Sequence, residues 1–314
     1  MGIFTTTLNQ MITLLSLLLI GFLLVKCRVL RPEDAGILSK LENTLFTPAL
    51  IMGAFIKNFT LDTLKECWKL LLFSLVIELI LIPIALLIGK SFRKRERYEQ
   101  GILAYGLALS NFGFVGNAVM LAVFPEYFME YVIFTLVLQT VVYVWAVPTL
   151  LIPVAQGGGL RARLKSFVNP MFIGLAVGIV LSLLPVELPT SLMSAIDMAG
   201  SCMAPIAMLL TGITVASTKL VKALRAPELW MCGALRLVVI PLLALFVFRY
   251  LPLPHSYLVC AFCTLAMPVG LNPIVIPTAY GKDTTLAAAL ALVSHVLAVL
   301  SLPLMFLLMT RILL

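Results

Sequence analysis

The feature that most constrains this chain is a series of apolar runs, each about as long as a lipid bilayer is thick. A helix crosses the hydrocarbon core with about 20 apolar residues. Backbone polar groups in lipid must be paired internally, which favours helices. We therefore expect an all-α membrane protein with ten transmembrane helices. The runs cover residues 7–25, 34–56, 68–89, 100–123, 130–153, 168–185, 191–216, 229–249, 257–280 and 285–310.

The composition agrees with lipid as the surrounding solvent. Of the 314 residues, 62% are hydrophobic and 11% are charged, whereas soluble domains have about 45–50% apolar and about 25% charged residues. The ten runs leave almost no chain for a domain outside the membrane, so a soluble enzyme is not expected. The net charge of +8 comes from short loops between apolar runs, and this pattern does not indicate a nucleic-acid partner.

The basic residues predict how the chain lies in the membrane. Fifteen lysines and arginines follow the odd-numbered runs, and five lie on the other side. Because cytoplasmic loops carry the excess of lysine and arginine, we expect a cell inner membrane protein with both termini outside. The first run has no basic residue before it, so we expect a retained helix and not a signal peptide. The run Arg93–Arg97 is expected to contact anionic membrane lipid.

The two halves of the chain repeat the same features at nearly one spacing. Because each half holds five helices, an odd number, the second half must enter the membrane from the opposite face. Such inverted repeats are typical of secondary transporters. We expect a first repeat at 1–155, a cytoplasmic linker at 156–166 and a second, inverted repeat at 167–314. The matched residues are Pro48 and Pro205, Glu78 and Arg236, Gly113 and Gly270, and Gln139 and His295, at spacings of 156 to 158 residues.

Helix-breaking residues interrupt the fourth and ninth runs at equivalent places. Residues 110–117 read SNFGFVGN, and residues 267–273 read MPVGLNP. Proline removes an amide donor, and a residue that precedes proline is biased away from the helical conformation. Paired breaks at bilayer depth are the best sequence indication of a transporter's binding site. The alternative is that the glycines only allow close packing and the prolines only kink helices.

The amino ends of such half-helices carry a partial positive charge, which favours an anionic substrate group. We therefore predict a site for a small organic anion at the two breaks. Its predicted residues are Asn111, Gly113, Gly116, Asn117, Pro268, Gly270, Asn272 and Pro273.

Two charged residues lie deep in the third and eighth runs. Glu78 and Arg236 occupy matching repeat positions with opposite sign, and a charge at a helix centre costs about 2.5–3.5 kcal/mol. We expect them to face one another, or the crossing of the broken helices, as a buried charge pair. Glu78 would then exchange a proton during transport. The alternative is a static pair that joins two helices.

Asn43, Gln139 and His295 are secondary candidates for the site. Asn43 approaches the level of Pro48, and Gln139 and His295 occupy matching positions, although a lone membrane histidine more often serves a helix–helix hydrogen bond. Lys40 and Glu42 are expected to lie at the inner membrane surface. No cofactor and no metal site is expected, because the Cys260 and Cys263 pair has no second pair to complete a ligand set.

These motifs resemble the auxin efflux carrier family over essentially the whole chain. The likeness rests on Asn-x-Gly-x-x-Gly at 111–116, Pro-x-Gly-x-x-Pro at 268–273, Tyr280-Gly281-x-Asp283, and Leu-Ser-Lys-Leu before Pro48-Ala-Leu. It implies that helices four and nine cross at their breaks, as in sodium/proton and bile-acid transporters. It also implies alternating access, export or exchange of small carboxylates, and suggests a homodimer.

The leading prediction is a secondary active transporter of a small organic anion, with the proton as its coupling ion. A sodium-coupled bile-acid-like symporter or a cation/proton antiporter is the alternative, and it needs acidic and hydroxyl ligands at the crossing. A membrane enzyme is not expected, because the chain has neither HExxH nor GxSxG. Paired broken helices also argue against a channel or a sensor.

Overall fold

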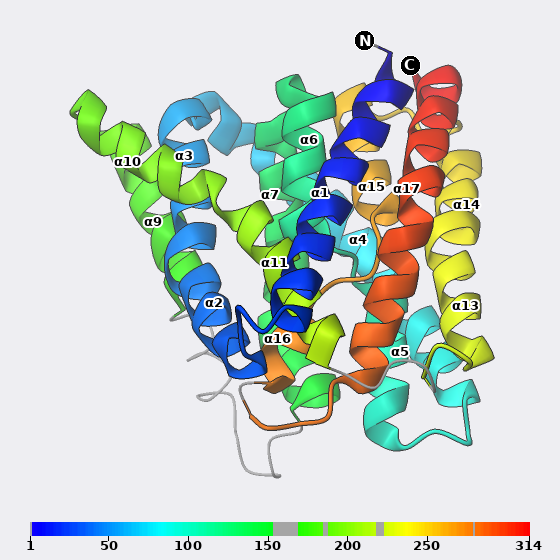
Figure 1. Cartoon of the computed structure of the whole chain (residues 1–314). Coiled ribbons are helices and arrows are strands. Elements are labelled where there is room, and N and C mark those ends of the chain that lie inside the picture. Colours follow the sequence, from blue (N-terminus) through cyan, green and yellow to red (C-terminus); the bar gives the residue numbers. More distant parts are fainter. Residues whose placement is uncertain (1, 153–168, 185–187, 218–222, 279) are drawn as a thin grey trace.

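The computed structural model describes residues 2–152, 169–184, 188–217, 223–278 and 280–314, and the predicted linker at 156–166 lies outside them. The described chain is helical apart from its connections, and its helices stand side by side with both termini at one end (Figure 1). Six helices in this part are long and apolar enough to cross a membrane, namely Ile3–Lys26, Trp68–Ser91, Pro125–Leu151, Thr190–Ser217, Pro227–Phe248 and Thr285–Leu313.

The first half consists of α1 (Ile3–Lys26), η1 (Pro32–Asp34), α2 (Ala35–Leu41), η2 (Glu42–Phe46), α3 (Thr47–Asn58), α4 (Leu61–Ser91), α5 (Arg97–Ala108), η3 (Phe112–Gly116), α6 (Asn117–Val123), η4 (Pro125–Tyr127), α7 (Phe128–Val141) and η5 (Val142–Leu151). The second half consists of α9 (Pro170–Leu183), α10 (Thr190–Ser201), α11 (Met203–Ser217), α13 (Pro227–Ala234), η6 (Leu235–Val239), α14 (Ile240–Phe248), α15 (His255–Ala266), α16 (Asn272–Thr278) and α17 (Thr285–Leu313).

Proline and π-helical turns divide the longer segments into these pieces. Pro170 and Pro227 stand in the first turn of their helices, where the missing amide hydrogen costs nothing, and Pro48 follows the π-helical turn η2 directly. The elements η2, η3, η5 and η6 are π-helical, a conformation that is frequent at functional sites. The predicted run 34–56 is one continuous helical segment with the π-helical turn η2 inside it, whereas the runs 100–123 and 257–280 are each interrupted by non-helical backbone.

The fourth and ninth segments are interrupted, as predicted, and the two interruptions meet. After α5 and after α15 the backbone is extended, at Leu109 and Met267, and Ser110 pairs with Val269 in an antiparallel bridge. The Asn111 amide donates to the Pro268 carbonyl at 2.7 Å, and the Gly270 amide donates to the Leu109 carbonyl at 3.2 Å. These two hydrogen bonds partly satisfy a backbone that helix breaking leaves unpaired.

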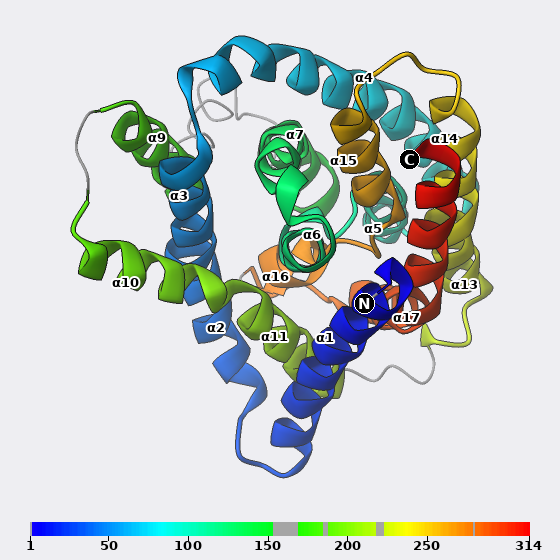
Figure 2. The same ribbon diagram turned by 90° about the horizontal axis from the view of Figure 1, so that it is seen from above.

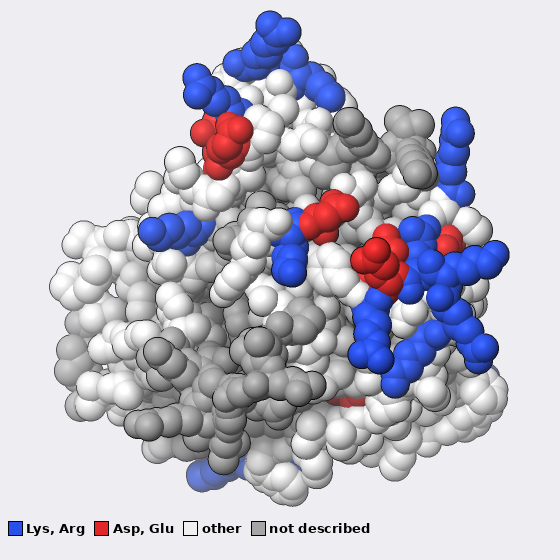
Figure 3. All heavy atoms as spheres, turned by 90° about the horizontal axis from the view of Figure 1, so that it is seen from below, with Lys and Arg blue, Asp and Glu red and all other residues white. Residues whose placement is uncertain are grey.

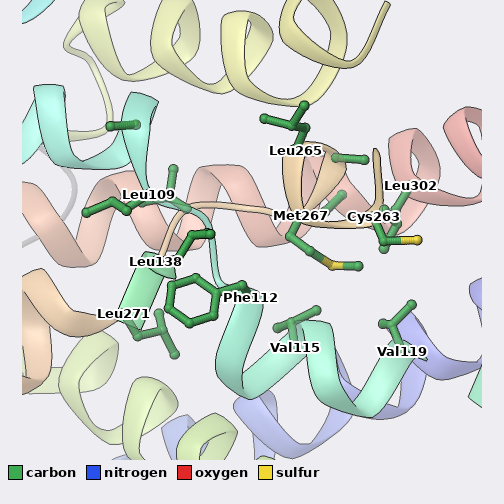
Figure 4. Packing of buried hydrophobic residues seen from close by; sticks show 14 of the residues in the cluster. Leu109, Phe112, Val115, Val119, Leu138, Cys263, Leu265, Met267, Leu271 and Leu302 are labelled. Carbon is green, nitrogen blue, oxygen red and sulfur yellow. The ribbon is translucent and has the colours of Figure 1, made fainter. Parts of the chain in front are cut away.

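Apolar side chains surround this crossing. Figure 4 shows that side chains from both broken segments and from the helices beside them pack together there. The labelled buried residues include Leu109, Phe112, Leu138, Leu265, Met267 and Leu271. The extended backbone is thus enclosed in protein and does not face lipid.

Two groups of helices flank the crossing when the molecule is seen from above (Figure 2). One group holds α1, α2, α3, α9, α10 and α11; the other holds α5, α13, α14, α15 and α17, with α6, α7 and α16 between. In the first group α1 packs along α11 and α3 packs along α9. A Cβ atom at Gly21 or at Gly212 would collide with the backbone of the other helix of the α1–α11 pair, so glycine permits this close approach.

Basic residues gather on the face opposite the termini (Figure 3). Part of this face is the loop between α4 and α5, where Arg95 donates to Glu228 at 3.0 Å and to Glu99 at 3.3 Å. The hydrogen bond to Glu228 raises the pKa of the Arg95 guanidinium above its usual value. This contact ties the loop to the first turn of α13.

Candidate functional site

A small cavity of about 50 Å³ lies beside the crossing, and we call it the crossover cavity. One wall is the crossing itself, and the other comes from the helix group that contains α3, α9 and α11. It is lined by residues 110–114, Asn117, residues 270–272, Asn43, Thr47, Ile51, Val132, Thr135, Leu136, Gln139, Tyr143, Met171 and Met203.

The helix formed by η3 and α6 begins at this cavity, and the residues of its first turn line it. Asn111 caps the helix, because its Oδ1 accepts from the Phe114 amide at 3.2 Å and from the Val115 amide at 3.3 Å. Within the described chain the amides of Phe112 and Gly113 have no acceptor. Free amides and the helix dipole together make such an amino end attractive to anions.

Gly113 is the part of this amino end that opens most freely to the cavity. A Cβ atom added there would meet nothing within 4 Å. The second broken segment contributes Gly270, Leu271 and Asn272 to the lining of the same cavity.

Asn111 lines the cavity and also contacts His295. Its Nδ2 donates to His295 Nε2 at 3.0 Å, and the Nδ1 of His295 lies 2.7 Å from the Ala291 carbonyl. These contacts place the ring proton on Nδ1. His295 therefore holds Asn111 in place, whereas Gln139, at the matching repeat position, lines the cavity. Asn111 thus caps the helix and also lines the cavity, and its role as a direct ligand stays a prediction.

The carboxyl ends of the half-helices point to Arg236, a side chain that is only 1% exposed. Its guanidinium donates to the carbonyls of Leu107 at 3.0 Å and Ala108 at 3.4 Å, at the end of α5. It also donates to Thr264 at 2.9 Å and Met267 at 3.2 Å, at the end of α15. One buried cation thus compensates the partial negative charge of two helix ends.

Glu78 lies nearby but does not form an ion pair with Arg236 in the described chain. It is 2% exposed and its Oε2 has no hydrogen-bond partner. The two charges still act on each other electrostatically. Of the two predicted arrangements, the structure has Arg236 facing the crossing and not a direct contact between the two side chains.

The remaining predicted residues build the crossing more than they line the cavity. Gly116 lies against Tyr131, whose hydroxyl donates to the Phe112 carbonyl at 2.8 Å. A Cβ atom at Gly270 would lie 2.9 Å from the Ser110 carbonyl oxygen. Pro268 supplies the carbonyl that Asn111 binds, and Pro273 stands in the first turn of α16.

Two fully buried polar atoms of residues that line the cavity have no partner in the described chain. They are the Oγ of Ser110 and the Oδ1 of Asn117, and both residues are buried. Asn272 is already engaged, because its Nδ2 donates to the Tyr105 hydroxyl at 2.9 Å. A buried polar group without a partner costs free energy, so a ligand or water that bonded to these atoms would recover part of that cost.

Among the residues that line the cavity, sequence reasoning missed several apolar ones and four polar ones, namely Thr47, Ser110, Thr135 and Tyr143. The spacing gives a partial signal for Tyr143, because it follows Gln139 by four residues and so shares its helix face. Its hydroxyl donates to Asn43 Oδ1 at 3.4 Å, which joins two sides of the cavity.

The prediction for Glu42 is wrong, although Lys40 is exposed as expected. Glu42 is completely buried. The π-helical turn η2 begins at this residue, and its carboxyl group points into protein instead of reaching the membrane surface. Local sequence carried no sign of this burial, because α9, α10 and α11, which cover it, lie more than a hundred residues further along the chain.

Comparison with known proteins gives one finding. A family described as "Membrane transport protein" matches this chain in two segments, residues 6–163 and 159–306, which together span nearly all of it. No similar protein is found among curated proteins.

Proposed function

Because this chain belongs to the membrane transport protein family, which is the auxin efflux carrier family, we propose that it is a secondary active transporter that exports or exchanges a small organic anion. The family makes it a multi-pass membrane transporter and not an enzyme. The substrate class and the mechanism are our proposal, and they rest on the geometry of the crossing.

The observation that supports the proposal most is that the carboxyl ends and the amino end of the half-helices have different surroundings. The carboxyl ends of α5 and α15 are bound by Arg236, whereas the amino end at Phe112 and Gly113 faces the cavity with free amides. The negative ends are thus compensated inside the protein and the positive end is left for a ligand. A carboxylate suits such a site, because it accepts hydrogen bonds from amides and favours a positive potential.

Alternating access is the mechanism we propose for this site. We propose ten membrane spans in two inverted repeats of five. In the proposed repeat, α1 corresponds to α9 and α11 corresponds to α3. The contact between α1 and α11 therefore has a counterpart between α9 and α3, and both contacts are present, which supports the repeat. The cavity lies between this helix group and the crossing, so relative movement of the two parts would expose it to one side of the membrane and then to the other.

The same repeat gives the proposed orientation, with both termini outside the cell inner membrane. The termini share one end of the molecule, and the basic face lies at the other (Figures 1 and 3). A basic face toward the cytoplasm agrees with the usual distribution of lysine and arginine.

A cation carrier fits the cavity less well. Among the described residues that line the cavity, none is acidic, and the carbonyls of Leu107, Ala108 and Thr264 that could bind a cation already accept from Arg236. We propose the proton as the coupling ion instead of sodium, with Glu78 as one carboxyl group that exchanges it. Replacing Glu78 by Gln should then alter the pH dependence of transport; full transport with an unchanged pH profile would exclude this role.

A substitution that places a methyl group in the cavity tests the anion site. Gly113→Ala fills open space in front of the free amides, so we expect carboxylate binding to fall about tenfold or more while the protein stays folded, because a carboxylate needs close approach to the amides. Binding is measured as thermal stabilisation of the purified protein by acetate, succinate, benzoate and their uncharged amides, followed by flux into proteoliposomes.

Gly36→Ala is the matched control, because a Cβ atom there also meets nothing within 4 Å and the residue is exposed, far from the cavity. We expect it to bind as the unsubstituted protein does. Stabilisation by sodium together with no response to any carboxylate would contradict the proposed function.

A further inference from the structure

Glu42 is a buried carboxyl group that the proposed transport cycle does not yet use. It is 0% exposed in the described protein. The Thr47 hydroxyl donates to its Oε1 at 3.0 Å, and its Oε2 has no hydrogen-bond partner. An ionised carboxylate would need several donors or a cation to balance the loss of water at such a position.

Among the described residues, the helices packed around Glu42 supply no such cation. The turn η2, which contains Glu42, contacts α2, α3, α9, α10 and α11. On these elements Lys40 is exposed, Lys57 is paired with Asp197 at 2.7 Å, and the described part of α9 and α11 has no ionisable side chain. Cys202, between α10 and α11, donates to the Met198 carbonyl. The remaining ionisable neighbour is Tyr143 of η5, which donates to Asn43.

Glu42 is nevertheless connected to the crossover cavity. Asn43, the next residue, and Thr47, its hydrogen-bond donor, both line that cavity. The π-helical turn causes this arrangement, because the Thr47 amide bonds to the Glu42 carbonyl five residues earlier. The widened turn therefore places the buried carboxyl group directly behind a hydroxyl group that faces the cavity.

We propose that Glu42 is a proton-binding site, linked to the crossover cavity through Thr47, whose proton is bound together with the anion. The link to the anion rests on the proposed function. In the uptake step a hydronium ion in the cavity gives a proton to Thr47 Oγ1, and Thr47 passes its own proton to Glu42 Oε1. The hydronium ion becomes water, Glu42 becomes neutral, and Thr47 is regenerated.

The charge of Glu42 determines whether anion affinity rises or falls with pH. Neutral Glu42 does not repel an anion in the cavity, whereas ionised Glu42 does. Anion affinity should therefore fall as the pH rises and Glu42 loses its proton, by up to about tenfold per pH unit for one linked proton. Glu42→Gln is permanently neutral, so its anion affinity should stay within about twofold over the same pH range.

Infrared spectroscopy of the full-length protein at neutral pH tests whether Glu42 carries a proton. We expect the C=O stretch of a protonated carboxyl group, an intensity loss in Glu42→Gln, and no loss in the control Glu126→Gln, which replaces an exposed residue of η4. Glu78→Gln should remove a separate band and leave the Glu42 band in place. A spectrum of Glu42→Gln that is identical to that of the unsubstituted protein would overturn the proposal.

Thr47→Val tests the connection to the cavity. Valine keeps the shape of the side chain but cannot pass a proton, so the Glu42 band should remain. The band shifts when the carboxyl proton is exchanged for deuterium in D2O, and we expect this exchange to become at least about tenfold slower. Exchange as fast as in the unsubstituted protein would remove Thr47 from the path.

The coupling is measured separately, as protons taken up when succinate or benzoate binds at an alkaline pH at which the Glu42 C=O band of the ligand-free protein has disappeared. Proton uptake that is lost in Glu42→Gln is expected, and equal uptake in both proteins would refute the coupling. Failure of every carboxylate to bind, with the Glu42 band still present, would overturn the proposed function and the coupling but leave the proton site standing.

Discussion

At the scale of single residues, the crossing depends most on Arg236. Its side chain is 1% exposed and donates to four backbone carbonyls. Arginine has five donors in a planar arrangement, whereas lysine has three on a single nitrogen atom. Only the guanidinium can reach carbonyls on both α5 and α15 at once.

Replacing Arg236 by Lys should therefore destabilise the protein although the charge is kept. We expect a loss of about 2–4 kcal/mol in the free energy of unfolding, since each hydrogen bond to a charged group contributes about 1.5–3 kcal/mol. The measurement is unfolding in detergent by titration with SDS. The exposed Arg249 is the control site, and Arg249→Lys should change little. Equal stability of both variants would show that the four carbonyl contacts are not important.

Sequence reasoning was most successful where a residue's own chemistry decides its environment. A charge or an asparagine in mid-membrane needs a polar partner, which singled out Arg236, Glu78 and Asn111. The identity of the partner depends on tertiary structure. That Asn111 binds His295, and that Arg236 binds carbonyls and not Glu78, was therefore beyond local sequence.

At the scale of elements, the two broken helices support each other through a short antiparallel pairing. Ser110 and Val269 form its bridge, and Gly270 brings the strands into contact. A Cβ atom at Gly270 would lie 2.9 Å from the Ser110 carbonyl oxygen and 3.2 Å from that of Leu109. Backbone atoms in a buried crossing have little freedom to move away.

Gly270→Ala should therefore weaken the crossing by about 1–3 kcal/mol, the usual cost of overpacking. Gly233→Ala in α13 is the control, because its Cβ atom would meet only the ends of the Leu297 and Val293 side chains, at 3.3 and 3.6 Å. The same SDS titration compares the two variants. If Gly270→Ala were as stable as Gly233→Ala, the close backbone contact at the crossing would be refuted.

Local sequence predicted the two helix breaks but not the π-helical turns. Proline, glycine and asparagine predicted both helix breaks, because their backbone preferences act within a few residues. The π-helical turns carry no such signal, since they arise where packing between distant helices widens a turn. The burial of Glu42 and the cavity position of Thr47 follow from one of these turns and were missed for that reason.

At the scale of the whole molecule, the account requires both termini on the outer side. Alkaline phosphatase fused after Leu314 should therefore be active, because the enzyme matures only outside the cytoplasm. A green fluorescent protein inserted between Lys94 and Arg95, in the loop between α4 and α5, should fluoresce. An inactive phosphatase together with a non-fluorescent loop insertion would show that the protein has the opposite orientation.

The central claim is that two interrupted helices cross within the membrane and offer free amides to an anion. A cryo-electron microscopy map of the protein with its most stabilising carboxylate tests this most directly. We predict carboxylate density within hydrogen-bonding distance of the Phe112 and Gly113 amides, between the crossing and α3. Carboxylate density on the basic face, or a continuous helix through residues 109–111, would contradict the claim.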